Sequence, residues 1–459
     1  MSQSTLGRKP SELTEMSVPK AIARLATPVA LANLGQTAVE WATLGMLGTL
    51  GAESLAAVGF SRTVFWWVIS WIFAFGNGIM ALVARNIGAG QEDRARRTIV
   101  QAFLLGFVMT GFAAIAGILG SRFALPLMGA EPEVVRLGVP YLNIMFVSVP
   151  FMINFFFGIF TLRALGDAHL TLWLQGVVGL TQLVMARLLI FGWGPFPRLG
   201  LVGGATAVVL SRIVGLVGVA YVLFSGASRI KLVREDLTLR PHWQTLRSLI
   251  TVSMPNALEW LGADSQKALL VRIIAATGEG SFAVSAVTVG RQVEELFGTI
   301  GMGMASAAGT LVGQNLGAGK PERAQDSAKR TCVTTIVMFA LASIPFLFFP
   351  RVVVGLFTND SRVLALGALY LVMLGITSPA YAASMVYAGG LRGAGDTRSP
   401  MASDLLLLWV VQLPLAYVLG LLTPLGIHGI YISYGLFWVI YGLWLKQRFD
   451  AGRWMDIAV

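Results

Sequence analysis

The chain has 459 residues, of which 56% are hydrophobic and 12% are charged, and its mean hydropathy is +0.73. In soluble domains, roughly a quarter of all residues are charged. The composition therefore excludes a soluble protein and indicates one embedded in a membrane. The formal charge of +11 does not indicate a nucleic-acid partner, because the basic residues separate apolar runs instead of clustering on a solvated face.

The first 20 residues are polar and lack the short apolar core of a signal peptide. We therefore expect residues 1–20 to form a cytoplasmic N-terminal tail. The single cysteine, Cys332, lies in an apolar run, so the sequence offers no disulfide framework and no metal-ligand spacing. We expect it to be a small buried side chain.

Twelve runs are long and apolar enough to cross the membrane, which takes about 20 residues in a helix. They cover residues 21–47, 63–84, 102–120, 139–161, 170–186 and 203–225, and then 249–275, 282–312, 331–349, 363–391, 401–421 and 426–445. A turn signal at Thr423-Pro424-Leu425-Gly426 separates the last two. Helices satisfy their own backbone groups in lipid, so the sequence predicts an all-α membrane protein with twelve transmembrane helices.

An internal repeat at an offset of 229 residues divides these helices into two sets of six. It relates residues 86–95 to 315–324, the LRALGD run at 162–167 to LRGAGD at 391–396, and Arg62 to Arg291. We expect two homologous six-helix lobes, residues 21–228 and 248–447, a cytoplasmic linker at 229–247 and a cytoplasmic tail at 448–459. An even number of spans gives both lobes the same orientation.

Most of the 34 Lys and Arg fall in the N-terminal tail, the linker, the C-terminal tail and the loops on the same side, including Arg163 and Arg392. By the positive-inside rule, both termini are expected in the cytoplasm. The glycines of Gly317-Ala318-Gly319 lack the GxxxxGK[S/T] pattern of a phosphate loop, so we expect a tight turn at the end of a helix and no nucleotide-driven pump.

Glu40 is the only acid in the first span and shares one stripe of the helix with Asn33, Gln36 and Thr43. An acid inside the membrane is costly unless it has a function or a partner. Glu40 is therefore a candidate proton-coupling residue. The alternative is a carboxylate neutralised by a fixed partner, Arg187 or Arg212.

The seventh span carries Glu259, Asp264, Lys267 and Arg272. Asp264 and Lys267 are spaced for an ion pair on one helix face, while Glu259 has no obvious partner in its own helix. Glu259 and Asp264 are the further candidates for proton or cation coupling. Arg291, Glu294 and Glu295 share a face of the eighth span, where we expect an ionic gate or strut.

Catalytic or metal-binding arrangements do not emerge from the sequence. His169, His242 and His428 fall at loop ends or in the linker, and no Ser/His/Asp or Cys/His set has a plausible context. We therefore expect a protein that is not an enzyme and that has no cofactor beyond a coupling proton or sodium ion.

The sequence resembles the MATE family of multidrug and toxic compound extrusion transporters over nearly its whole length. The motifs that carry the resemblance are LGAESLAAVG at 50–59, ARNIGAG at 84–90, LVGQNLGAG at 311–319 and LRGAGDTR at 391–398. The resemblance implies two six-helix lobes arranged as a V around a central cavity that opens alternately to either side. It also implies export of organic cations and other amphipathic compounds against a proton or sodium gradient.

The chain departs from the family pattern at two places in the N-terminal lobe. Thr43 stands where many prokaryotic members have an aspartate, and Gln182, Ala186 and Arg187 stand where an Asn...Asp-Pro pattern is usual. The resemblance then suggests that Glu40 has taken over the role of the missing acids, with Arg187 as partner or competitor. Asn33, Gln36, Thr43, Gln182 and Arg187 form the expected polar network of the substrate cavity.

The function we expect is a secondary antiporter of the prokaryotic inner membrane, exporting small drug-like compounds, often cationic, or metabolites. Its expected partners are the substrate and membrane lipid, without nucleic acid, and a monomer suffices. The alternative is a flippase for lipid-linked precursors, as in distant relatives of the family. That function would favour a cationic cavity lined by Arg62, Arg187, Arg212, Arg272 and Arg291, but those relatives usually have additional spans.

Overall fold

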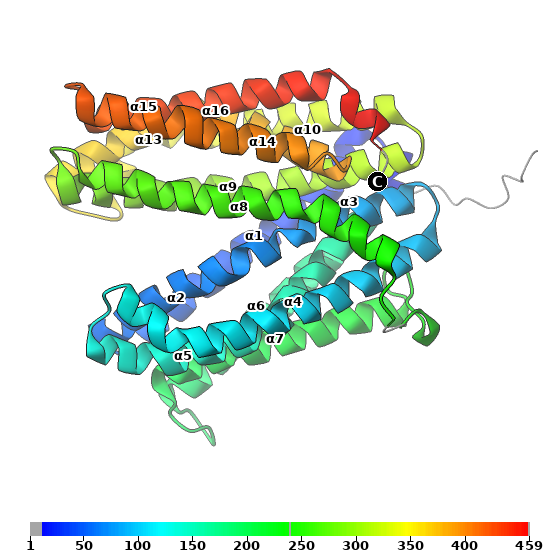
Figure 1. Cartoon of the computed structure of the whole chain (residues 1–459), viewed down its shortest axis with the longest axis horizontal. Helices are drawn as coiled ribbons and strands as arrows, with labels where there is room; N and C mark the ends of the chain where they lie inside the picture. The colour runs from blue at the N-terminus through cyan, green and yellow to red at the C-terminus, as the bar shows by residue number, and fades with distance from the viewer. Residues whose placement is uncertain (1–11, 238–239, 458–459) are drawn as a thin grey trace, which may run out of the picture. The chain divides into compact units, whose positions relative to one another are not determined.

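The computed structural model describes residues 12–237 and 240–457, and within these residues it contains helices and turns but no strand (Figure 1). The first half of the chain forms α1 (Val18–Gly48), α2 (Ala52–Phe73), α3 (Phe75–Gly88), α4 (Glu92–Leu127), α5 (Pro132–Leu165), α6 (Ala168–Phe191) and α7 (Gly200–Ser225). The second half forms α8 (Trp243–Ala275), α9 (Gly280–Gly317), α10 (Pro321–Ala342), α11 (Ile344–Phe348), α12 (Pro350–Gly355), α13 (Ser361–Gly393), α14 (Arg398–Leu406), α15 (Leu413–Tyr417) and α16 (Ile427–Asp450).

The repeat seen in the sequence is also a repeat of helices. Subtracting 229 from the bounds of α13, Ser361 and Gly393, gives 132 and 164, and α5 spans Pro132–Leu165. The same subtraction places α9 over α2 and α3, and α10 to α12 over α4. The prediction of an all-helical protein built from two sets of six spans is therefore confirmed.

Ten helical segments of the described chain are long and apolar enough to cross a membrane. The first and seventh predicted spans fall outside this set, yet they form α1 with 31 residues and α8 with 33 residues. At 1.5 Å per residue, both exceed the roughly 30 Å of a hydrocarbon core. Their lower hydropathy comes from the polar side chains that made them candidates for chemistry.

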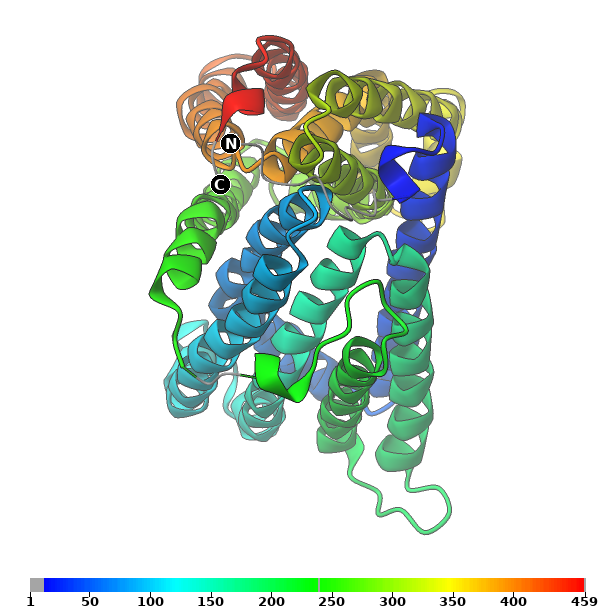
Figure 2. The ribbon, with the colours of Figure 1, turned by 90° about the vertical axis from the view of Figure 1, so that its right-hand side faces the viewer.

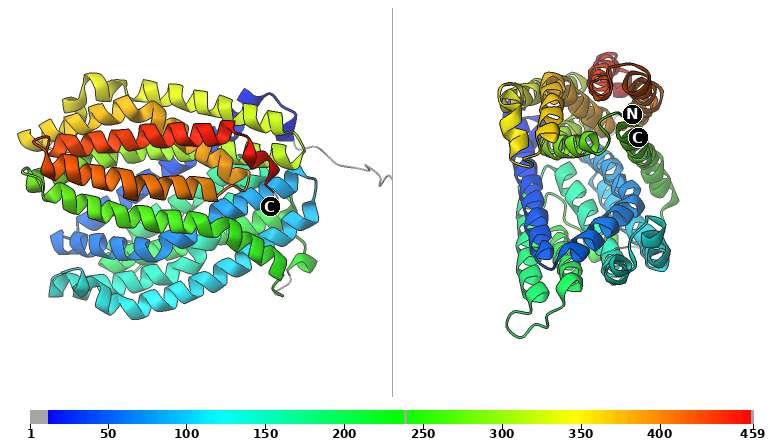
Figure 3. Two further views of the ribbon diagram at one scale, coloured as in Figure 1. Left: turned by 45° about the horizontal axis from the view of Figure 1, so that its top comes forward. Right: turned by 90° about the vertical axis from the view of Figure 1, so that its left-hand side faces the viewer.

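The chain divides into two compact units. The N-terminal unit comprises Thr27–Ile87 and Gln91–Ala257, and the C-terminal unit comprises residues 12–26, Gly88–Gly90 and residues 258–457. In the N-terminal unit, α5 packs against α2, α4 and α7, and α6 packs against α7. In the C-terminal unit, α13 packs against α9, α10 and α16, while α14 and α15 run beside α16 (Figure 3).

Glycines with positive φ form the turns that end α3 and α9, as the sequence predicts for the turn after Gly317. Gly90 and Gly319 have φ of 68° and 71°, a backbone region that favours glycine. The backbone N–H of Gln91 donates to the Asn86 carbonyl at 2.9 Å, and that of Lys320 donates to the Asn315 carbonyl at 2.8 Å. The predicted tight turn after Gly317 is confirmed, and its repeated copy closes α3 in the same way.

The connection between the two halves of the chain is partly helical, which corrects the linker predicted at residues 229–247. A short 3₁₀ turn covers Arg234–Asp236, and α8 already begins at Trp243 (Figure 2). Gln101 of α4 fixes the approach to α8, since its side chain donates to the Arg240 carbonyl at 3.0 Å and accepts from the His242 N–H at 2.9 Å. The His242 ring then accepts from the Thr245 N–H at 3.4 Å, so it satisfies a backbone donor at the helix start.

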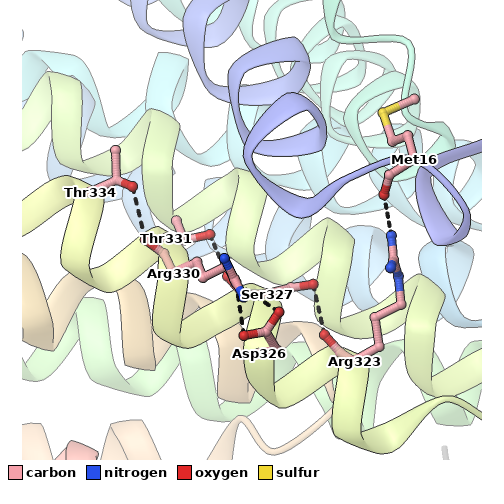
Figure 4. Close-up of polar contacts among 7 residues, drawn as sticks. All are labelled: Met16, Arg323, Asp326, Ser327, Arg330, Thr331 and Thr334. Carbon is pink, nitrogen blue, oxygen red and sulfur yellow. Dashed lines mark hydrogen bonds and ion pairs between the residues drawn. The ribbon is translucent and has the colours of Figure 1, made fainter.

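A short segment before α1 is anchored to the start of α10 within the C-terminal unit. Arg323 donates to the backbone carbonyl of Met16 (Figure 4). Lys320 Nζ lies 3.2 Å from the Thr14 carbonyl oxygen. Asp326 and Arg330 form an ion pair at 2.8 Å one turn further along α10. The basic residues after the Gly317 turn thus bind backbone carbonyls and a neighbouring carboxylate.

Candidate functional site

The polar stripe of α1 centres on Glu40. Gln36 Nε2 donates to Glu40 Oε1 at 3.4 Å, and Arg62 of α2 lies 3.4 Å from Glu40 Oε2. The ion-pair partner is therefore Arg62, which fits the alternative of a fixed partner but is neither of the two arginines, Arg187 and Arg212, suggested for that role. The short turn between α1 and α2 makes these helices neighbours. Arg62, which is 22 positions from Glu40 in the sequence, therefore contacts it.

The two expected partners lie elsewhere. Arg187 of α6 stacks on the rings of Phe191 and Trp193, with its Cζ 4.9 Å and 5.8 Å from their centroids. Arg212 of α7 is buried and acts on Glu40 electrostatically, without forming the ion pair. Glu40 thus has one arginine in contact and a second arginine within electrostatic range.

The positions at which the chain departs from the family pattern face one another. Gln182 Nε2 of α6 donates to Thr43 Oγ1 of α1 at 3.3 Å, and both side chains are buried. Thr43 in turn donates to the Val39 carbonyl at 2.8 Å. A neutral contact therefore occupies the place where the resemblance would put acids.

An aromatic cluster, of which Phe155 and Phe160 are buried and Phe73 and Phe156 half-buried, lies between two arginines of the N-terminal unit. Phe73, Phe155, Phe156 and Phe160 form this cluster, with centroid distances of 4.9 Å for Phe73 to Phe156 and 5.6 Å for Phe73 to Phe160. Arg212 lies over Phe155 and Phe156, and Arg163 lies 5.7 Å from the Phe160 centroid. Arg163 also donates to Asn33 Oδ1 of α1 at 3.3 Å.

In the C-terminal unit, Glu259 of α8 forms an ion pair with Arg392 of α13. Both side chains are largely buried, at 7% and 18% exposure. Asp404 of α14 and Tyr441 of α16 interact electrostatically with this pair. Asp404 also interacts electrostatically with Lys267, which is paired with Asp264. Glu259, Asp404 and Arg392 together therefore carry one negative charge in excess when all three groups are ionised.

The next turns of α8 hold the other predicted charges. Asp264 pairs with Lys267 at 3.1 Å, as the spacing predicts, and this pair is partly exposed. Gln266 donates to Gln412 at 3.1 Å, and both are buried. Gln412 ends a π-helical turn at Leu407–Gln412, and Trp409 of that turn donates to the Gly262 carbonyl at 3.2 Å. Such turns inside helices are frequent at functional sites.

Glu294 of α9 binds two tyrosines. Glu294 accepts hydrogen bonds from Tyr370 of α13, at 2.7 Å, and from Tyr434 of α16. The charge on this face is therefore held by hydroxyl groups from two neighbouring helices, which differs from the ionic gate expected for Arg291, Glu294 and Glu295. A half-buried carboxylate held in this way ties α9 to α13 and α16.

Among residues 12–237 and 240–457, no three His, Cys, Asp or Glu side chains are arranged to hold a metal ion. Cys332 is buried, as expected. His169 accepts from Trp173 Nε1 at 3.3 Å at the start of α6, and His428 lies near the Leu425 carbonyl.

The sequence reasoning missed three of these residues as parts of the site. Arg163 and Arg392 were counted as loop cations, but α5 and α13 extend past them and their side chains are buried or largely buried. Asp404 was not singled out. Its signal was present in the sequence, since it is the only acid in the predicted span 401–421.

Comparisons with known proteins place the chain in a family. The sequence model of the MatE family matches residues 28–187 and 265–418. A probable multidrug resistance protein NorM of Thermotoga maritima is 26% identical over 453 residues, covering 96% of this chain and 94% of that protein. An FAD transporter of Shewanella oneidensis is 28% identical and covers 88% of each chain.

Among solved structures, the chain is similar to a MOP superfamily transporter from Pyrococcus furiosus described as having a binding pocket of reverse polarity. The TM-score is 0.89 with 23% identity, over 97% of this chain and 99% of that one. An outward-facing multidrug resistance MATE family transporter gives a TM-score of 0.88 at the same identity and coverage. With more than half of its residues matched by the family model, the chain belongs to the MatE family of multi-pass membrane transporters.

Proposed function

We propose that this protein is a secondary antiporter that exports small organic compounds in exchange for protons or sodium ions, with the coupling cation bound at Glu259 and Asp404. The observation that carries the proposal is the largely buried Glu259–Arg392 ion pair, with which Asp404 interacts electrostatically. Unbalanced charge inside a membrane protein is costly, so a site with one excess negative charge favours uptake of a cation. A proton or a sodium ion needs no further cofactor.

Glu40 is the second candidate for coupling, and its surroundings make it the weaker one. Its carboxylate contacts Arg62, and Arg212 lies within electrostatic range. Its negative charge is thus already compensated by two positive charges. Asp264, paired with Lys267 in a partly exposed position, is likewise compensated.

The test is transport in proteoliposomes with an imposed proton gradient and, separately, an imposed sodium gradient. Efflux of two fluorescent probes, the organic cation ethidium and the organic anion riboflavin 5′-phosphate, is recorded in separate experiments together with the internal pH. We expect Glu259→Gln and Asp404→Asn to abolish gradient-driven efflux, and Glu40→Gln to retain most of it. Asp264→Asn, the same chemical change as Asp404→Asn at a partly exposed position, serves as the control. Full coupling in both Glu259→Gln and Asp404→Asn would overturn this assignment.

We further propose that the protein lies in a prokaryotic inner membrane as a monomer with both termini in the cytoplasm. The distribution of Lys and Arg over the loops supports this orientation. Cysteines introduced at exposed Arg94 or Arg198 should differ in their reaction with an impermeant thiol reagent in intact cells. The relatives found by comparison are named a probable multidrug resistance protein and an FAD transporter, and these names give the flippase alternative no support.

A further inference from the structure

Arg212 is a buried cation whose hydrogen-bonding capacity is incompletely used. Its side chain lies in α7 with 5% of the residue exposed. Within the described chain, its Nε and Nη1 atoms are buried and have no hydrogen-bond partner. A guanidinium carries five donors, and leaving such donors unsatisfied in a buried position destabilises the fold. A residue of this kind fits a site whose anionic partner is supplied from outside the chain.

The protein's own acid does not fill that role. Glu40 lies within electrostatic range of Arg212, but its carboxylate contacts Arg62 at 3.4 Å and Gln36 at 3.4 Å. Arg163, with 6% of the residue exposed, adds a further positive charge at the other end of the aromatic cluster. The surroundings of the aromatic cluster are thus positive overall: Arg62, Arg163 and Arg212 are set against Glu40.

The aromatic cluster supplies the second half of a binding site. Phe155 and Phe156 lie against the Arg212 guanidinium at 6.0 Å and 5.5 Å from their centroids. Phe156 continues to Phe73 at 4.9 Å. Aromatic side chains next to a guanidinium suit a ligand with a flat ring system and a carboxylate or phosphate, because the rings stack and the guanidinium binds the oxygens.

We propose that Arg212 binds the anionic group of an aromatic substrate, and that this site selects organic anions over organic cations. The inference rests on the proposed transport function and specifies its substrate class. The Shewanella oneidensis relative is named an FAD transporter, and FAD combines flat rings with phosphate groups. Glu40 and the anionic group of the substrate compete for Arg212. Substrate binding therefore weakens the electrostatic attraction between Arg212 and the Glu40 carboxylate.

The test compares two probes that share a ring system and differ in one phosphate: riboflavin 5′-phosphate and riboflavin. Binding to the purified full-length protein is measured by quenching of flavin fluorescence. We expect the wild-type protein to bind the phosphate at least about tenfold more tightly than riboflavin, since a charged hydrogen bond contributes at that level. Equal affinities for the two probes would overturn the proposal without any variant.

Variants then assign the selectivity to Arg212. Arg212→Gln should weaken binding of the phosphate about 10- to 100-fold and leave riboflavin unaffected, while Arg212→Lys should retain part of the preference. Arg136→Gln is the matched control, because Arg136 is exposed on α5 and paired with Glu133. Unchanged phosphate binding in a folded Arg212→Gln or Arg212→Lys protein would refute the role of Arg212.

Two further arms separate this inference from its alternatives. Binding is repeated with phosphatidylglycerol added, because a lipid headgroup offers the same phosphate chemistry. The lipid could compete with the flavin in a way that depends on Arg212, while the protein shows no preference for the flavin phosphate. That result would show that Arg212 binds a lipid headgroup and not a substrate. Ethidium efflux driven by a proton or sodium gradient, in a protein that does not prefer the flavin phosphate, would overturn the proposed anion site. It would still support the proposed transport function. Absence of all driven transport would overturn the function itself.

Discussion

Removing one partner of the Glu259–Arg392 pair should destabilise the protein far more than removing a comparable surface charge. Both side chains are largely buried, at 7% and 18% exposure. Deleting one member of a buried pair typically costs about 3–5 kcal/mol, because the other charge is left uncompensated. Glu259→Gln leaves Asp404 near Arg392, so we expect a cost at the lower end, about 3 kcal/mol.

Arg392→Gln removes the guanidinium that forms the ion pair with Glu259 and leaves this carboxylate within electrostatic range of Asp404. The two carboxylates then repel each other, so we expect a cost near the upper end, about 5 kcal/mol. Uptake of a proton relieves that repulsion, and the destabilisation should therefore be smaller at pH 5.5 than at pH 8. The double variant Glu259→Gln/Arg392→Gln removes both charges of the pair. Its loss of unfolding free energy should be smaller than the sum of the two single losses by about 1–3 kcal/mol.

The assay is the free energy of unfolding in mixed micelles, followed by tryptophan fluorescence for the two single variants and the double variant. Asp264 and Lys267 provide the matched control cycle, because they belong to the same helix and are 36% and 56% exposed. A pair of that kind should show a coupling of no more than about 0.5 kcal/mol. An equally small coupling for Glu259 and Arg392, or an Arg392→Gln protein whose stability does not change with pH, would refute the reasoning.

Two further predictions concern the C-terminal unit. A Cβ added at Gly393 would lie 2.1 Å from the Gly309 carbonyl oxygen, so Gly393→Ala should force α9 and α13 apart and cost about 1–3 kcal/mol. Gly59→Ala, where the added Cβ meets nothing within 4 Å, should leave thermal stability unchanged, and equal losses for both variants would contradict the packing. Arg323→Ala should release the backbone around Met16, seen as faster amide exchange of residues 12–16 with unchanged exchange in α13. Unaltered exchange there would mean that the anchor does not hold this segment.

The architecture was predictable because it depends on features that repeat along the chain. Apolar runs of the right length and the 229-residue offset are local or periodic signals, and the helix bounds of α5 and α13 follow that offset closely. The turn at Thr423-Pro424-Leu425-Gly426 was also predictable, since α16 begins at Ile427. The ion pair between Asp264 and Lys267 of α8 was predictable as well, from their spacing along one helix.

The partners of those residues were not predictable in the same way. Glu259 and Arg392 are 133 positions apart, and no helical periodicity links α8 to α13. Arg392 was taken for a loop residue because the predicted span ends at residue 391, but α13 continues to Gly393 and keeps Arg392 in its last helical turn. Only the packing of helices distant in sequence shows which charges meet. For Asp264 and Lys267, which are three residues apart on one helix, the sequence was sufficient.

Comparing equivalent positions of the two units explains why we assign opposite charge preferences to them. Arg163 and Arg392 are equivalent by the 229-residue offset, and each contacts the first long helix of its half, through Asn33 in one case and Glu259 in the other. Three further pairs are Ala30 with Glu259, Gln175 with Asp404, and Arg212 with Tyr441.

Across these four positions the N-terminal set has two arginines and no acid, whereas the C-terminal set has two acids and one arginine. The shared helical framework therefore presents an excess of positive charge in one half of the chain and of negative charge in the other. A cation such as a proton is favoured by the second set, and an anionic group by the first. Exchanging one pair, with Arg212→Tyr in one protein and Tyr441→Arg in another, should weaken anion binding in the first protein and cation coupling in the second. Loss of both activities in both proteins would show that the two sets do not have separate roles.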